Sequence, residues 1–285
     1  PPQGAVIRYA LKKDVEGEMT LQILDAGGTV VRSFSSVKEV PEFEEDDADA
    51  PEKPRKKPVL STEAGLRQVV WDLAYDSATK IRKAKVEGSP EAAPRALPGL
   101  YSVRLKAAGQ TLQAPLEVRA DPRLSLPAAD LEAQLRFARQ VQDQVSRLAG
   151  LVAQIRSVRE QVAAKVGALA GNARAAAWTK AAESLTAKCD ALEEKLHNPK
   201  AEVEYDILAK GARLYSRISP MLAFATEGSG APTQGMREVF AEEIKELDGL
   251  EADWKALIGG DLAALGRQAR ELDLGDVVVP GAIAK

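Results

Sequence analysis

The feature that most constrains this chain is an uninterrupted apolar stripe of helical period that begins near its middle. Apolar side chains recur every three or four residues, at Leu131, Leu135, Ala138, Val141, Val145, Leu148, Val152, Ile155, Val158, Val162, Val166 and Leu169. This spacing places them on one face of a single α-helix. Ser125 is positioned as its N-cap, with Pro127 in the first turn, where proline is tolerated. A helix this long with an apolar face needs other helices to cover it.

More helical patterns follow and supply that cover. Gly171 and Asn172 end the first helix, and the later helices are expected to end at residue 197 and to span 205–226, 233–258 and 261–272. Pro220 should kink or split the third helix. Gly259 and Gly260 should end the fourth. The connections are short, so neighbouring helices should be antiparallel.

The first third of the chain alternates like β-strands and is punctuated by glycine and proline. The expected strands span residues 4–11, 19–24, 29–34, 65–73, 100–105 and 111–118. Trp71 should fill the centre of their core, because one large ring covers much area there. We therefore predict an α+β multidomain chain. An N-terminal antiparallel β-sandwich, Ig-like or FnIII-like, covers residues 1–122, and an antiparallel bundle of long α-helices covers 123–285.

Two long charged loops interrupt the predicted sandwich, at about residues 36–62 and 76–97. The first carries Glu42, Glu44, Glu45, Asp46, Asp47, Asp49, Lys53, Arg55, Lys56 and Lys57, and the second carries Lys80, Arg82, Lys83 and Lys85. A calcium site in the first loop is an alternative, but the spacing of an EF-hand is absent. We favour a solvated loop there. The second is expected to be a surface flap, and a partner contact remains an alternative.

Composition narrows the possible functions. The formal net charge is −3, so there is no basic excess for nucleic acid. No run reaches the roughly 20 apolar residues that span a bilayer, and no signal peptide is present. Because the sequence starts with Pro1 rather than Met, we expect a processed product or a piece of a longer chain.

Reactive residues are scarce. The chain has one cysteine and one histidine, too few for a zinc site built from thiolates and imidazoles. Cys189 lies on the apolar stripe of the second helix and is expected in the core. His197 in that helix's last turn suits the negative end of the helix dipole better than catalysis. The opposite face of the first helix carries arginines that we interpret as solvated, at Arg136, Arg139, Arg147, Arg156 and Arg159.

A family resemblance adds to this interpretation. The segments that carry it are 4–11, 21–26, 30–32, 64–66, 70–73, 97–105 (Leu-Pro-Gly-Leu-Tyr-Ser-Val-Arg-Leu), 121–123 (Asp-Pro-Arg) and 230–233. Their order resembles the C-terminal region of bacterial sortilin-like, BNR-repeat β-propeller proteins, which are often labelled glycosyl hydrolases. The strand part also resembles the Ig-like module of flagellar hook-capping proteins.

The resemblance implies export, hence a periplasmic or cell-surface location. It also implies that any hydrolase activity lies in an upstream propeller, because Ser-x-Asp-x-Gly-x-Thr-Trp repeats are absent here. The loop at 76–97 is more charged than the family's usual proline-glycine stretch, so a shared loop function does not carry over.

The sequence therefore predicts a non-catalytic structural or protein-interaction module. It would be the C-terminal accessory part of an exported propeller protein, or a subunit docked on a larger extracytoplasmic assembly. We identify no catalytic, cofactor-binding or metal-ligating residue. The alternatives are a glycan-acting hydrolase, for which Glu63 and Asp72 are weak candidates, and a carbohydrate-binding module using Tyr9, Tyr75 and Tyr101. An elongated helical assembly partner is a further alternative.

Overall fold

The fold comes from a computed structural model of the chain. It describes residues 3–38, 58–85, 92–123, 125–169, 171–203, 206–207, 211–228, 230–272 and 274–281. The acidic and basic residues of the first predicted loop, from Glu42 to Lys57, lie outside the described residues, so its predicted character stays a prediction. The chain is a mixture of strands and helices, which confirms the α+β class.

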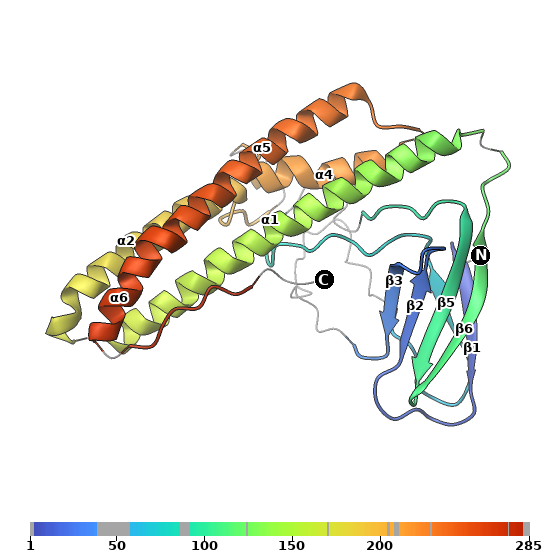
Figure 1. Ribbon diagram of the computed structural model, residues 1–285, viewed down its shortest axis with the longest axis horizontal. Coiled ribbons are helices and arrows are strands. Elements are labelled where there is room, and N and C mark those ends of the chain that lie inside the picture. Colours follow the sequence, from blue (N-terminus) through green and yellow to red (C-terminus); the bar gives the residue numbers. More distant parts are fainter. Residues whose placement is uncertain are drawn as a thin grey trace. The chain divides into compact units, whose positions relative to one another are not determined.

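All six described strands precede the first helix (Figure 1). Their bounds are β1 Ala5–Leu11, β2 Thr20–Leu24, β3 Val30–Ser35, β4 Gly65–Trp71, β5 Gly99–Ala107 and β6 Gln110–Val118. They form a two-stranded sheet, β1-β4, and a four-stranded sheet in the order β3-β2-β5-β6. Every pairing is antiparallel. Short turns explain this pattern: at the β2–β3 turn Gly28 takes a φ of 81°, and the Asp25 carboxylate accepts the Thr29 amide at 2.8 Å.

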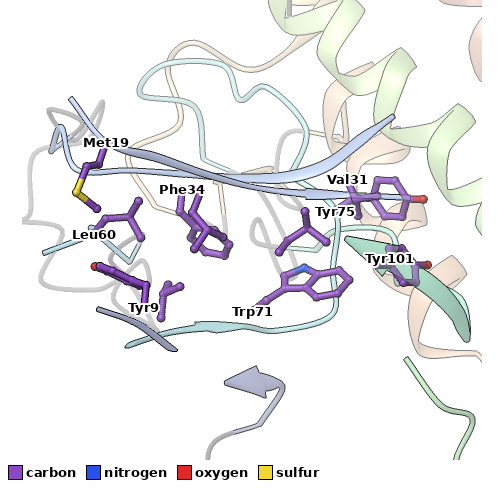
Figure 2. Close-up of a cluster of buried hydrophobic side chains, with 11 residues drawn as sticks. Tyr9, Met19, Val31, Phe34, Leu60, Trp71, Tyr75 and Tyr101 are labelled. Atoms are coloured by element: carbon purple, nitrogen blue, oxygen red, sulfur yellow. The ribbon is translucent and has the colours of Figure 1, made fainter. Parts of the chain in front are cut away.

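The two sheets bury one shared hydrophobic cluster (Figure 2). It contains Tyr9, Met19, Leu21, Ile23, Val31, Phe34, Leu60, Val69, Trp71, Tyr75 and Tyr101. Trp71 has no exposed surface and meets the Tyr101 ring edge-on, with the centroids 5.5 Å apart. Its indole Nε1 donates to the Ala74 carbonyl at 2.8 Å. The predicted central role of Trp71 is confirmed.

The helical part continues to the end of the described chain. The helices are α1 Ala128–Ala168, η1 Ala173–Ala175, α2 Ala176–Leu196, α4 Leu214–Glu227, α5 Gln234–Leu257, η2 Ile258–Leu262 and α6 Ala263–Glu271. α1 confirms the predicted long helix, and its apolar stripe is buried from Phe137 to Val162. It starts directly after Pro127 rather than at Ser125, and Gly171 beyond its end takes a φ of 85°.

Two helix boundaries differ from the sequence prediction. Residues 206–207 are helical, as predicted, but α4 begins at Leu214, because Gly211 before it takes a φ of 80°, which a helix cannot contain. Pro220 does not split α4. Gly259 and Gly260 do not end the fourth helix, because the chain continues through the π-turn η2 directly into α6. Burial of Leu262, Leu265 and Ala269 outweighs the poor helix propensity of glycine.

Two compact units organise these elements. The strand unit comprises residues 1–78, 91–142 and 222–232, and the helical unit comprises 79–90, 143–221 and 233–285. The predicted division at residue 122 therefore follows the secondary structure but not the compact units. The difference has a physical cause: the first turns of α1 pack with the strands, where Leu135 joins the core, Arg139 stacks on Tyr75 and Gln142 donates to the Asp76 carbonyl.

The second predicted loop is not a surface flap along its whole length. Ile81 is buried with 2% of its surface exposed, and Thr79 N donates to Ser146 Oγ at 3.0 Å. Both contacts lie within the helical unit. An apolar side chain among the lysines and arginines of a charged loop thus anchors residues 79–85 to the helices.

Candidate functional site

The two weak acid candidates lie at opposite ends of one strand. Glu63 precedes β4 and pairs with Arg67 at 2.9 Å, and Asp72 follows β4 and accepts the Ala74 amide at 3.2 Å. A strand rises about 3.3 Å per residue, so β4 separates them by more than about 20 Å. Paired glycosidase carboxylates lie within about 10 Å of each other. The structure does not bring these two residues together as a catalytic pair.

The three candidate tyrosines do not form an exposed row. Tyr9, Tyr75 and Tyr101 are each less than 10% exposed and belong to the core of the strand unit (Figure 2). The Tyr9 hydroxyl donates to the Ser61 carbonyl at 3.0 Å, and the Tyr101 hydroxyl donates to the Leu97 carbonyl at 2.8 Å. Burial raises the pKa of Tyr101 to about 12. These rings stabilise the fold and offer no platform for a sugar.

Cys189 is part of the core of the helical unit. Its side chain has no exposed surface, and burial together with the nearby Asp190 charge raises its pKa to about 11. The thiol therefore stays protonated at neutral pH and is not a nucleophile. This confirms the interpretation of Cys189 as a core residue.

The most unusual polar arrangement in the helical unit is a buried ion cluster between α1 and α2. We call Arg156, Arg159, Asp190, Glu193 and His197 the α1–α2 cluster. Glu193 is 1% exposed and accepts from Arg156 Nε at 2.7 Å and from Arg159 Nη1 at 2.9 Å. Arg159 also pairs with Asp190 at 2.6 Å. Glu193 and His197 stand one helical turn apart, so both point to the same face of α2.

His197 completes the cluster from the C-terminal end of α2. Its Nε2 lies 2.9 Å from Glu193 Oε1 and 3.1 Å from Arg156 Nη2. Nε2 can donate to the Glu193 carboxylate or accept from the Arg156 guanidinium but cannot do both, so the tautomer of His197 decides which of the two contacts is a hydrogen bond. The Nδ1 atom is buried and has no hydrogen-bond partner among the described residues. Arg156 Nη1 also donates to the Arg82 carbonyl at 2.6 Å, which ties residues 79–85 to this cluster.

The electrostatics of the cluster favour an ionised Glu193. Burial alone would raise the pKa of this carboxyl, but the hydrogen bonds from His197 and Arg156 and the two arginine charges outweigh it and lower the pKa to about 2. Both of its oxygens are occupied by these donors. A buried carboxylate held this way is not poised to accept a proton from a substrate. The cluster is therefore a cross-link between helices.

Cross-links of the same kind join other helices of this unit. Arg147 of α1 pairs with Asp248 at 2.8 Å and with Glu251, both on α5. Trp254 Nε1 of α5 donates to Gln154 Oε1 at 3.0 Å, and Trp178 Nε1 of α2 donates to the Leu265 carbonyl at 3.2 Å. Each of these large side chains is therefore held by a polar contact as well as by packing.

The sequence interpretation of the α1 arginines is correct only in part. Arg136 is exposed and pairs with Glu132 on its own helix, as expected of a solvated face. Arg147, Arg156 and Arg159 keep only about a fifth to a third of their side-chain surface exposed, because acids from α2 and α5 meet them. The position of Glu193 next to the apolar stripe of α2 could have indicated a buried ion pair. The sequence of α1 alone, however, does not show which acids on other helices pair with its arginines.

Metal binding finds no support in the described ranges, where no cluster of three or more His, Cys, Asp or Glu side chains could hold an ion. None of the helices in the part of the chain that the structure describes is both long and apolar enough to cross a membrane. Comparisons with protein-family models, curated proteins and solved structures return no match.

Proposed function

We propose that this chain is a non-catalytic interaction module, an Ig-like β-sandwich followed by a helical bundle, that docks a partner protein or a neighbouring domain. The sandwich proposal is supported by two antiparallel sheets that share one core. The resemblance to the C-terminal region of sortilin-like propeller proteins makes an exported accessory module the form of this role that we favour. A buried Glu193 whose two oxygens are both held by arginines from another helix is typical of a scaffold rather than of an active site.

The observation that carries the proposal is the exposure of β6. Residues 110–115 of this edge strand are exposed, and Leu112 keeps 64% of its surface in solvent. Leu112 pairs directly with Leu105, so both side chains lie on the face of the sheet that bears the core. The two-stranded sheet therefore leaves the first half of β6 uncovered on its inner side. A long edge strand with an uncovered apolar row is a typical docking surface for another protein.

Pro115 limits how a partner can use this strand. It pairs with Ser102 inside the ladder and has no N–H, so β6 cannot offer a continuous row of donors on its open edge. We therefore expect a partner to cover the inner face around Leu112 rather than to extend the sheet. A glycan would need exposed aromatic rings, and among the described residues Phe224 is the aromatic side chain that is mostly exposed.

The test compares two substitutions in neighbouring positions of β6. Leu112→Lys places a charge on the inner face, and Gln113→Lys places the same charge on the outer face, where Gln113 is exposed beside Ser102. Each variant is expressed in the native source, cross-linked gently and analysed by mass spectrometry for stoichiometric partner chains and for the intact N-terminus. We expect the partners to be retained with Gln113→Lys and lost with Leu112→Lys. Full retention of every partner by Leu112→Lys, together with turnover of a small substrate, would contradict the proposal.

A further inference from the structure

The segment at residues 274–281 lies extended along α1 in the helical unit (Figure 1). It has no regular secondary structure of its own. Val277 and Val279 are half-buried, while Val278 between them is 64% exposed. This alternation is typical of an extended chain lying with one side against a surface.

The contacts from α1 are made to the backbone of this segment. Gln161 Nε2 donates to the Val278 carbonyl at 2.7 Å, and Gln161 Oε1 accepts the Val278 amide at 2.9 Å. Lys165 Nζ, one helical turn further on, donates to the Gly275 carbonyl at 2.5 Å. The pair of bonds between one amide group and one residue reproduces the pattern by which a neighbouring strand holds its partner.

Ser157, on the same helix, orients the Gln161 side chain independently of residues 274–281. Its Nε2 also lies 3.2 Å from the Ser157 carbonyl and 3.2 Å from Ser157 Oγ. A helix carbonyl can only accept, so this contact fixes which end of the amide carries the hydrogens. The oxygen is thereby turned toward the peptide that needs an acceptor. Such preorganisation lowers the ordering cost of binding.

We propose that Gln161 and Lys165 form a docking site for an extended peptide segment of a partner protein, which residues 274–281 occupy in cis. The site recognises main-chain groups, so it accepts any extended segment that presents small apolar side chains at alternate positions. The covalent connection through α6 gives the chain's own segment a high effective concentration, so this segment acts as a built-in competitor. The site belongs to the helical unit and does not depend on the exposed face of β6.

The test uses the full chain with Val278→Pro, which removes the amide that Gln161 accepts and frees the site. The probe is a fluorescent peptide of sequence Leu-Gly-Asp-Val-Val-Val-Pro-Gly, followed by anisotropy at protein concentrations up to about 1 mM. We expect saturable binding to the Val278→Pro chain and binding about tenfold weaker, or more, to the unaltered chain. Adding Gln161→Ala, or using a peptide N-methylated at the second valine, should each weaken binding by about tenfold.

The neighbouring exposed residue supplies the matched control, since Glu160→Ala in the same background should leave peptide binding unchanged. In the otherwise unaltered chain, Gln161→Ala should also speed hydrogen exchange at the Val278 amide several-fold. Equal binding to the unaltered and Val278→Pro chains, absence of saturable binding, or indifference to both Gln161→Ala and N-methylation would each overturn the proposal.

Discussion

The strand unit and the helical unit solve the same problem, the burial of polar groups, in different ways. In the strand unit the buried polar groups of Tyr9, Trp71 and Tyr101 are neutral and donate to backbone carbonyls. In the helical unit the buried carboxylate of Glu193 is ionised and pairs with Arg156 and Arg159. Neutral groups cost little when buried with a partner, whereas a charge stripped of its partner is costly. The two units should therefore respond differently to mutation and to pH.

The largest expected effect comes from removing the ring at the centre of the strand unit. Trp71→Ala should lower the free energy of unfolding of that unit by about 3–5 kcal/mol, because it empties a fully buried site. Trp178→Ala, with 2% of its surface exposed, is the matched change in the helical unit. Urea unfolding followed by probes in each unit measures both. A single shared transition that shifts equally for both variants would show that the units do not unfold separately.

Glu193→Ala should have the next largest effect, about 3 kcal/mol on the helical unit, because it leaves Arg156 and Arg159 facing each other without their shared carboxylate. Glu194→Ala is the control, since Glu194 only pairs with Lys200 at the surface, and its denaturation midpoint should not move. A Glu193→Ala variant as stable as the parent would mean that the cluster contributes specificity but no net stability.

Low pH should destabilise the helical unit more than the strand unit, because the Glu193 carboxylate stabilises only the helical unit. The folded pKa of Glu193 lies at about 2, below its ordinary 4.5. Its stabilising contribution is therefore complete above about pH 4.5 and is lost as the pH falls toward 2. The carboxyls of Glu117 and Asp121 in the strand unit also have lowered pKa values, through Arg119 and Arg123, but they are exposed and contribute little.

The expected measurement is a thermal melt of each unit between pH 5 and pH 2. Glu193→Gln should flatten the pH dependence of the helical unit and leave that of the strand unit unchanged. An unchanged slope in the variant would place the acid sensitivity elsewhere.

A smaller effect on stability is expected in the strand unit, from Tyr101 and at alkaline pH. Tyr101→Phe removes the hydrogen bond to Leu97 and should cost about 1 kcal/mol at neutral pH. Burial raises the folded pKa of Tyr101 from 10.0 to about 12, so its stabilisation is present below pH 10 and is lost as the pH rises through 12. Tyr215 of the helical unit has a pKa raised to about 12 in the same way, so both units should weaken in alkali. Absorbance titration of the phenols in each variant checks the assignment.

The smallest change is expected for Leu112→Lys. The side chain is already 64% exposed, so the free energy of unfolding should stay within about 0.5 kcal/mol of the parent. A stable variant makes any loss of partner binding interpretable as loss of a surface. A large destabilisation would instead show that Leu112 belongs to the core of the strand unit.

Much of the fold follows from local pattern. The strands lie within one or two residues of their predicted bounds at most ends, because alternation and turn glycines mark both the strand and its limits. Gly171 and Asn172 predict the end of the long helix, which ends at Ala168. These elements are specified by residues close to one another in the sequence.

The structure differs from the sequence prediction where residues far apart in the sequence contact one another. Gly259 and Gly260 predict a helix end from propensity, yet the buried apolar residues beyond them keep the helix running. The sequence of α1 alone suggests solvated arginines, but in the structure acidic residues of α2 and α5 pair with several of them. The sequence places His197 at the end of a helix, but its neighbours Glu193 and Arg156 could not be inferred from the helix-end pattern alone.

The π-turn at Ile258–Leu262 also determines what a change of chain length would do to the helical unit. An α-helix advances by about 100° per residue, and a π-turn accommodates one residue more than the regular helix needs. Deleting one glycine there would restore a uniform helix and leave the residues beyond it facing almost the same way, because the wide turn already absorbs the rotation of the extra residue. The Leu265 carbonyl would stay on the side that meets Trp178. The buried face of α6 should therefore tolerate the loss of one residue at this turn, whereas a deletion in the regular turns of α6 would rotate that face by about 100°.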